Sequence, residues 1–276
     1  MSIKAKILIL FCIQATNGLW SQSPWVQSKA GFYVEAGTRH QTAWTRLLHS
    51  GDQQKVQGSV NETTVWWSAA YGFTRKWTGV IDFPVRHSRR TPNTPSDPAS
   101  AQLWGVGNTQ LGLKYGIERQ GIYYALALYS ELPASGGEQN GLRAGFPAWA
   151  IKPLVSIGKK YPNFYAFAYG GAGWRSHHYS GLGWAGIESG WHWNRFWMAA
   201  SFDRMQSFNN GTLPEIGPER LTGLYHDGQS WWRYHFKITV NTGRFTGLTA
   251  STGQIIKGEW MPGTPSVSLS GFFKWD

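Results

Sequence analysis

Residues 232–240, WRYHFKITV, decide the fold, because apolar and polar side chains alternate along them without a break. In an extended strand the five apolar residues share one face and the four polar residues share the other. The apolar face is rich in aromatic rings, which is typical of a strand that crosses a bilayer. A half-buried strand of a soluble sandwich has a similar pattern, so the rest of the chain must distinguish the two.

Four further segments alternate in the same way, at residues 77–86, 108–115, 123–132 and 267–275. Weaker copies of the pattern begin near Gly31, Thr63, Ala148, Phe164, Gly181, Phe196 and Arg244. Together they predict an all-β protein, a transmembrane antiparallel β-barrel of about 12 strands, which is an even number as in single-chain bacterial barrels.

The connections between these segments alternate between long and short. Long ones occupy residues 47–60, 87–105, 134–147, 208–230 and 251–262, with a shorter loop at 177–180. Tight turns are expected at residues 72–75, 118–121, 159–163, 193–195 and 241–243. A barrel with both termini in the periplasm has short turns on that side and long loops outside, and a soluble sandwich has no reason to keep this rhythm.

Composition points the same way. The 276 residues include 17 Trp, 12 Tyr, 14 Phe and 34 Gly, and only 15% are charged. Aromatic rings collect at the two bilayer–water interfaces of outer-membrane barrels. After the first 21 residues no run of about 18 apolar residues occurs, which excludes membrane-spanning helices.

The first residues form a predicted signal peptide. Lys4 and Lys6 precede an apolar run at residues 7–15, which is too short to span a bilayer, and we expect cleavage after Ser21. The predicted organisation is therefore a signal peptide at 1–21 and an outer-membrane barrel at 22–276; a buried N-terminal strand is the alternative. Cys12, the only cysteine, lies inside the apolar run, so the mature chain would have no disulfide or thiolate site.

The charge is basic. Removal of Lys4 and Lys6 lowers the formal net charge from +11 to +9. Nucleic acid is not an expected partner, because the basic residues are scattered and the chain is predicted to leave the cytoplasm. The expected partners are outer-membrane lipids, anionic lipopolysaccharide beside basic loops, and a small-molecule solute.

Two stretches carry a family resemblance. Residues 105–108 (GVGN), which lead into 111–115 (LGLKY), resemble a "GxGD…lGLKY" strand, and residues 128–136 (LYSELPASG) resemble a strand that ends in "LPTG". Both resemble the outer-membrane transporters assigned to a phenol-degradation (MetA) pathway, and residues 25–37 are similar to the first strand of Bacteroidetes members. The chain departs from the pattern at Asn108, where Asp is usual, and at Ala134 and Ser135. The resemblance implies a barrel that passes or binds small molecules, aromatic ones being a candidate class.

The last strand resembles the signal by which the barrel-assembly machinery recognises its clients. Gly271, Phe273 and Trp275 alternate near the chain end, although such signals normally end on the aromatic residue and Asp276 follows it here. We therefore expect this machinery to be a partner through the C-terminal strand.

The polar faces of the expected strands carry ionisable residues of both signs. One interpretation is a water-filled lumen whose charges select a solute, and the other is a lumen closed by mutual ion pairs. The basic excess favours anions, with Arg233 and Lys237 expected to set that preference. The candidate lumen-lining residues are Glu35, Arg39, Glu62, Asp82, Arg86, Lys114, Glu131, Lys152, Glu188, Asp203, Arg233, His235 and Lys237.

The sequence thus predicts a passive channel or transporter for small solutes, and two alternatives remain. His178 and Ser180 have the spacing of outer-membrane serine hydrolases of the phospholipase or deacylase type, and in a strand this spacing would put both side chains on one face. A barrel with a structural or assembly role is the other alternative. No metal-ligand spacing or nucleotide motif stands out, so neither metal nor cofactor is expected.

Overall fold

The computed structural model describes residues 22–47, 53–95, 99–139, 142–212, 225, 227–259 and 261–275. The predicted signal peptide lies outside these residues. Within the described part of the chain, no helix has the length and hydropathy needed to cross a membrane.

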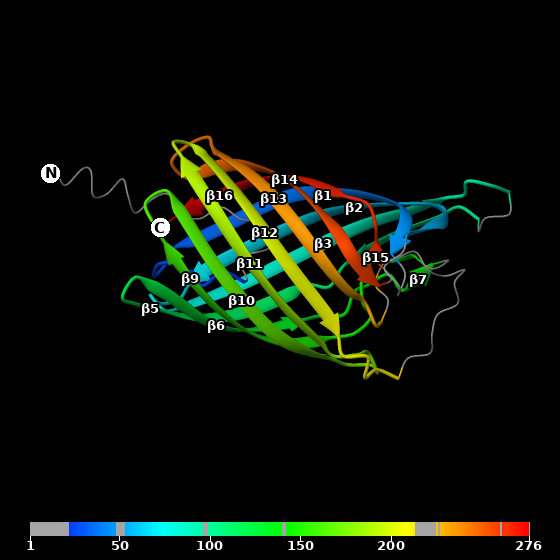
Figure 1. Ribbon diagram of the computed structural model, residues 1–276, viewed down its shortest axis with the longest axis horizontal. Helices are drawn as coiled ribbons and strands as arrows, with labels where there is room; N and C mark the ends of the chain where they lie inside the picture. The colour runs from blue at the N-terminus through cyan, green and yellow to red at the C-terminus, as the bar shows by residue number, and fades with distance from the viewer. Residues whose placement is uncertain are drawn as a thin grey trace.

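Long antiparallel strands make up the structure (Figure 1). They are β1 (Phe32–Leu47), β2 (Gln53–Gly72), β3 (Trp77–Thr91), β4 (Ala101–Val106), β5 (Gln110–Arg119), β6 (Ile122–Glu131), β9 (Ala150–Lys160), β10 (Phe164–Arg175), β11 (Leu182–Trp193), β12 (Phe196–Ser207), β13 (Ser230–Asn241), β14 (Thr246–Glu259) and β16 (Ser266–Trp275). Short elements are β7 (Glu138–Gln139), β8 (Leu142–Arg143) and β15 (Met261–Pro262).

The sheet closes on itself, because β1 pairs with β2 on one edge and with β16 on the other. Strands β4 and β5 share one position beside β3, with Val85–Arg90 of β3 facing β4 and Trp77–Asp82 facing β5. The ring therefore has 12 strand positions. The prediction of an all-β antiparallel barrel of about 12 strands is confirmed.

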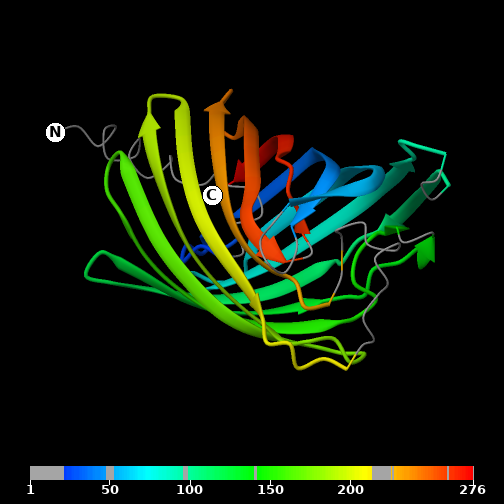
Figure 2. The ribbon, with the colours of Figure 1, turned by 45° about the vertical axis from the view of Figure 1, so that its right-hand side comes forward.

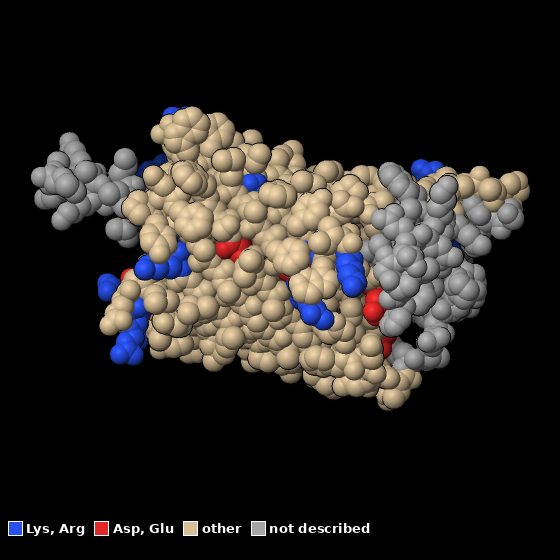
Figure 3. Space-filling view, in the orientation of Figure 1, with Lys and Arg blue, Asp and Glu red and all other residues tan. Residues whose placement is uncertain are grey.

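The alternation seen in the sequence separates the two faces of the wall. On β13, Phe236 and Ile238 are 53% and 52% exposed, whereas Lys237 and Thr239 are 2% and 1% exposed. Figure 3 shows a surface that carries few charged groups along the length of the barrel. An apolar outer face of this kind is expected in contact with lipid, because exposing so much apolar surface to water is unfavourable.

Exposed aromatic rings mark both ends of this apolar belt. Trp191, Trp193, Phe196 and Trp275 are exposed at one end, and Trp104, Trp149 and Trp174 are exposed at the other. Indole and phenyl rings in two such bands are typical of the lipid–water interfaces around a transmembrane barrel.

The two ends of the barrel differ (Figure 2). The turn end carries the five short connections 73–76, 120–121, 161–163, 194–195 and 242–245, together with the start of β1 and the end of β16. The loop end carries the longer connections. The expected alternation is present, but the strands run further at the loop end than predicted: β2 begins at Gln53, β3 continues to Thr91 and β14 continues to Glu259. Beyond the bilayer a strand keeps its backbone pairing without needing an apolar face, so the sequence pattern stops before the strand does.

Candidate functional site

The barrel interior gathers the polar residues that the sequence singled out. All thirteen candidate residues lie on barrel strands, and each is buried or half-buried. They alternate with the exposed apolar residues of the same strands, so their side chains face the interior.

Six of the thirteen residues form ion pairs. Lys237 Nζ lies 2.9 Å from Glu188 Oε2, and Arg233 Nη2 lies 3.1 Å from Asp203 Oδ2. Lys152 pairs with Glu131. The positive charges of Arg233 and Lys237, which we expected to set an anion preference, are therefore offset by neighbouring carboxylates.

Tyrosine hydroxyls add to this network. Tyr33 donates to Glu35 at 2.8 Å, Tyr165 donates to Glu188 at 2.7 Å, and Tyr169 donates to Asp203. Neutral phenols that donate to carboxylates help to hold these acids in a space with little water.

Most other candidate residues are bound to polar groups of the wall or of inserted segments. Asp82 accepts a hydrogen bond from Ser68, and His235 Nε2 lies 3.1 Å from Ser251 Oγ. Arg39 is attracted electrostatically by Glu62. The remaining contacts, those of Lys114, Arg86 and Glu62, involve segments that close the two ends of the barrel.

At the turn end the chain itself enters the barrel. Residues 22–31 precede β1, and Trp25 is only 5% exposed. Its ring lies edge-on to Tyr123, Tyr165 and Phe167, with centroid separations of 5.5, 6.2 and 5.5 Å. Gly158 on β9 leaves the space in which the Trp25 ring sits, because a Cβ there would overlap the indole.

Hydrogen bonds hold this N-terminal segment in place. Lys114 Nζ donates to the carbonyl oxygens of Ser23 and Trp25, at 2.9 and 3.3 Å. The backbone N–H of Gln27 donates to Thr78 Oγ1 at 2.8 Å. We call the segment 22–31 with these contacts the turn-end closure; from the sequence alone we expected only the start of the barrel here.

At the loop end an aromatic cluster closes the interior. Phe146 lies edge-on to both Tyr179 and Tyr225, each with a centroid separation of 5.7 Å. Arg175 stacks over Phe146 at 4.2 Å, and Arg86 stacks over Tyr225 at 4.5 Å. The five residues come from strands and loops far apart in sequence, and we call them the loop-end closure.

The tyrosines of the loop-end closure are held neutral. Tyr225 donates its hydroxyl to Glu62 Oε2 at 3.0 Å. Burial raises the pKa of Tyr225 well above its usual range, against a smaller lowering by Arg86, and burial also raises the pKa of Tyr179. The Tyr225 phenol is therefore a stable donor to Glu62.

Asn108 fixes the segment that carries Phe146. Its Nδ2 donates to the carbonyl oxygens of Leu132 and Phe146 at 3.0 and 2.8 Å, and its Oδ1 accepts from the Phe146 N–H at 2.7 Å. An amide donates and accepts at once, which an ionised Asp cannot do. Asn at this position therefore suits the hydrogen-bond partners around it.

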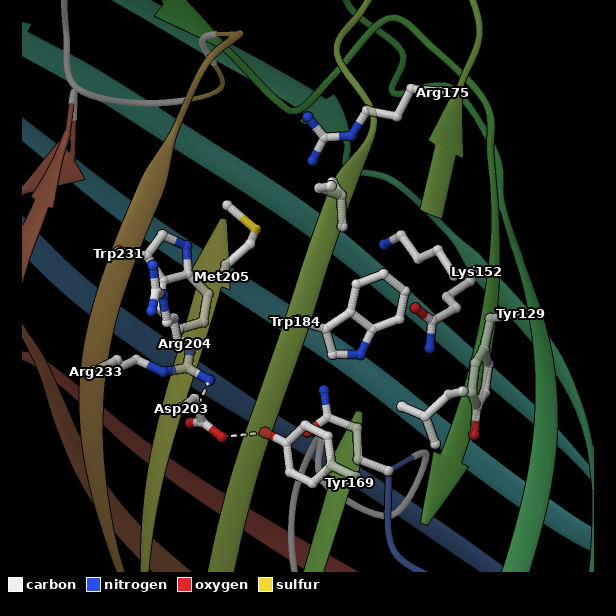
Figure 4. A pocket seen from close by; sticks show the side chains of 14 residues that line it. Tyr129, Lys152, Tyr169, Arg175, Trp184, Asp203, Arg204, Met205, Trp231 and Arg233 are labelled. Carbon is white, nitrogen blue, oxygen red and sulfur yellow. Dashed lines mark hydrogen bonds and ion pairs between the residues drawn. The ribbon is translucent and has the colours of Figure 1, made fainter. Parts of the chain in front are cut away.

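A cavity of about 170 Å³ lies between the two closures (Figure 4). Lys152, Arg175, Arg204 and Arg233 supply its positive charges, and Tyr129, Tyr169 and Trp184 supply aromatic surface. Lys152, Asp203 and Arg233 are lining residues that we expected from the sequence, whereas Arg175 and the rings were not expected. Aromatic residues are also common on the outer face of the wall. Only the alternation of inward and outward positions along each strand could have shown that these rings face the interior.

The geometry around Ser180 differs from the one that the hydrolase alternative expects. Residues 176–181 connect β10 to β11 and are not in a strand, and His178 has a φ of 63°. Ser180 Oγ donates to Asp227 Oδ2 at 2.8 Å and accepts from the Gly211 N–H at 2.9 Å. His178 is exposed whereas Ser180 is buried, so the expected common face does not form and Ser180 instead fastens a loop.

Comparisons with known proteins agree with the barrel. No family model and no curated protein sequence matches the chain. Among solved structures it is similar to the COG4313 outer membrane channel from Pseudomonas putida F1, with 13% identity and a TM-score of 0.73 over 95% of this chain and 100% of that one. The NanC porin gives 10% identity and a TM-score of 0.55 over 88% and 100% of the two chains. The translocator domain of the autotransporter NalP from Neisseria meningitidis gives 11% identity and a TM-score of 0.54 over 90% of each chain. These likenesses show the outer-membrane barrel fold.

Proposed function

We propose that this protein is a bacterial outer-membrane barrel through which small solutes pass by diffusion. The observation that carries the proposal is a closed barrel with an apolar outer face and a polar interior that contains a cavity between two closures. The similar solved structures include a protein described as an outer membrane channel and one described as a porin, which supports the same function.

The orientation follows from the two ends. In barrels of this kind short turns face the periplasm and long loops face outward, so the turn end, with the start of β1 and the end of β16, would be periplasmic. The loop end would then meet lipopolysaccharide, and the barrel-assembly machinery would recognise β16. Residues 1–21 would supply the export signal.

The interior suits a slow, narrow path better than an open pore. Paired carboxylates and cations leave a lumen with little net charge along β11, β12 and β13, where Glu188, Asp203, Arg233 and Lys237 lie. A solute must displace or pass one closure to reach the cavity and the other closure to leave it. We therefore expect low conductance with brief openings rather than the steady current of a wide porin.

Planar-bilayer recording and liposome swelling with the refolded full-length protein test this function. Low, resolvable conductance and slow swelling in small solutes are expected. Arg119→Gln, which removes an exposed charge beside a turn, serves as a matched control and should behave like the unchanged protein. A folded barrel that neither conducts nor admits any solute would contradict the proposal and leave a structural or assembly role.

The hydrolase alternative makes a separate prediction that the same preparation can test. It requires lipid deacylation that is lost in Ser180→Ala. We expect no such activity in either protein, because the Ser180 hydroxyl donates to Asp227 and not to an imidazole. Deacylation that depends on Ser180 would overturn this conclusion.

A further inference from the structure

The cavity owes its shape to two glycines on β10. Tyr169, Gly171, Gly173 and Arg175 are the successive inward positions of this strand. The two middle positions have no side chain, so a hollow is left between the Tyr169 ring and the Arg175 guanidinium.

Trp184 of β11 occupies part of this hollow and leaves the rest free. A Cβ at Gly171 would lie 2.7 Å from Trp184 Cζ2, and a Cβ at Gly173 would lie 3.2 Å from Trp184 Cζ3. The indole therefore lies over both glycines. In Figure 4 Trp184 stands in the middle of the cavity, with Arg175 above it and Lys152 and Tyr129 beside it.

The charges around Trp184 are unequal. Lys152 is paired with Glu131, but Arg175, which is 8% exposed, stacks on Phe146 and has a buried Nε with no hydrogen-bond partner among the described residues. Arg175 and Lys152 also repel each other electrostatically, while Asp227 attracts Arg175. Buried N–H groups are nearly always bonded. Arg175 and Arg233 both line the cavity and each has a buried Nε without a partner in the described part of the chain, but Arg233 is also paired with Asp203.

The size of the cavity indicates how large a ligand that carries a hydrogen-bond acceptor can be. Its volume of about 170 Å³ compares with the roughly 150 Å³ of an engineered protein cavity that takes up benzene. A cavity of this volume accommodates one six-membered ring with a small substituent. An aromatic ring also gains offset or edge contacts with Trp184 and the tyrosines that an aliphatic ring lacks.

We propose that this chamber binds one small aromatic carboxylate, with the carboxylate between Arg175 and Lys152 and the ring against Trp184. The inference rests on the proposed function, because the solute must pass one of the two closures to arrive. The chamber would then be a selective binding site along the path of diffusion. Arg175, rather than Arg233 or Lys237, sets the preference for anions.

Equilibrium dialysis of benzoate against the detergent-solubilised full-length protein tests the chemistry. Benzoate should bind one per chain, whereas benzamide, which has the same shape without the charge, should bind about tenfold more weakly or worse. Cyclohexanecarboxylate, which keeps the charge without the aromatic ring, should also bind more weakly. Equal binding of benzoate and benzamide would refute the anion site, and equal binding of the two carboxylates would refute the aromatic one.

Two variants locate the site. Arg175→Gln should weaken benzoate binding by about tenfold or more, because a charge-assisted hydrogen bond is lost. Arg119→Gln removes the same charge from an exposed position and should bind benzoate normally. Since Arg175 also stacks on Phe146, Gly173→Ala gives a second arm: it leaves every charge in place, narrows the hollow beside Trp184 and should likewise weaken binding.

The outcome separates this inference from the proposed function. A protein that conducts small ions but binds no benzoate would overturn the aromatic carboxylate site and leave the channel intact. A protein that neither conducts nor allows swelling would overturn the channel itself. Loss of binding in Arg119→Gln to the same degree as in Arg175→Gln would show that the effect is one of overall charge, and would remove the site from the chamber.

Discussion

The two ends of the barrel are closed by different physical means. At the turn end a piece of backbone enters the lumen and buries one large apolar ring, Trp25, among three other aromatic rings. At the loop end side chains meet across the mouth, and two of the five are arginines stacked on rings. Both closures contain hydrogen bonds and cation–π contacts, but the first is one continuous backbone segment with a large buried ring, and the second consists of separate side chains, one of them a neutral phenol.

This difference indicates how each end could open. A segment that continues directly into β1 can leave the lumen only by losing all of its contacts together, so the turn end should be either shut or open. Contacts between loop-end side chains can break one at a time, and a desolvated cation–π pair is worth about 2 kcal/mol, less than the burial of a Trp side chain. The loop end should therefore fluctuate more and respond to smaller changes.

The largest expected effect comes from Trp25→Ala. Truncation of a buried Trp costs about 3–5 kcal/mol. Here that cost weakens the packing of residues 22–31 inside the lumen and not the pairing of the strands. The segment should leave the lumen, and single-channel conductance should rise several-fold while the barrel stays folded.

Trp193→Ala is the matched control at the same end, because Trp193 is 68% exposed and points away from the lumen. Its conductance should equal that of the unchanged protein. If Trp25→Ala also leaves conductance unchanged, the narrowest point of the path lies at the loop end, and the loop-end closure rather than the turn-end closure limits conductance.

A smaller effect is expected from Asn108→Asp at the loop end. The carboxylate would face the carbonyl oxygens of Leu132 and Phe146, which now accept from the amide. Leaving such groups unsatisfied costs about 1–3 kcal/mol, so the segment that carries Phe146 should loosen and opening events should become more frequent without a larger unit conductance.

Asn163→Asp, at an exposed turn of the opposite end, introduces the same charge and should have no effect. A larger unit conductance in Asn108→Asp would mean that the segment 132–149 is a permanent part of the wall of the path. That result would contradict a fluctuating loop-end closure.

The wall could be predicted from the sequence because each of its residues depends on one local rule. Phe236 faces outward and Lys237 inward for the same reason, the period of two in an extended strand. Strand number followed from repetition of this pattern. Strand ends at the loop end, such as Glu259 of β14, could not be predicted, because backbone pairing continues where the apolar face stops.

The interior could be predicted only in part, since its residues depend on partners from distant strands. Inward parity placed Lys237 and Glu188 on polar faces, but nothing in the sequence shows that residues 49 positions apart form an ion pair. The same holds for Lys114, whose partners are carbonyl oxygens of a segment about 90 residues earlier in the chain. The alternation along a strand predicts whether a side chain faces inward or outward. Which distant side chain it contacts depends on how the barrel closes.

The smallest expected effect concerns the pH dependence of the loop-end closure. Burial raises the pKa of Tyr225 above that of an exposed phenol, so the closed form favours the neutral phenol that donates to Glu62. The stabilisation from this hydrogen bond is fully present below the ordinary tyrosine pKa of about 10 and is lost as the pH rises above that value. Opening frequency should therefore stay constant from neutral pH to about pH 9 and rise only in stronger alkali. Tyr225→Phe, which keeps the ring contact with Phe146 but cannot donate, should open slightly more often at neutral pH and lose the Tyr225-dependent part of the alkaline rise. A rise that is identical in both proteins would assign it to other groups, and a rise that begins near pH 7 would show that the Tyr225 phenol is not the buried neutral donor on which the loop-end closure rests.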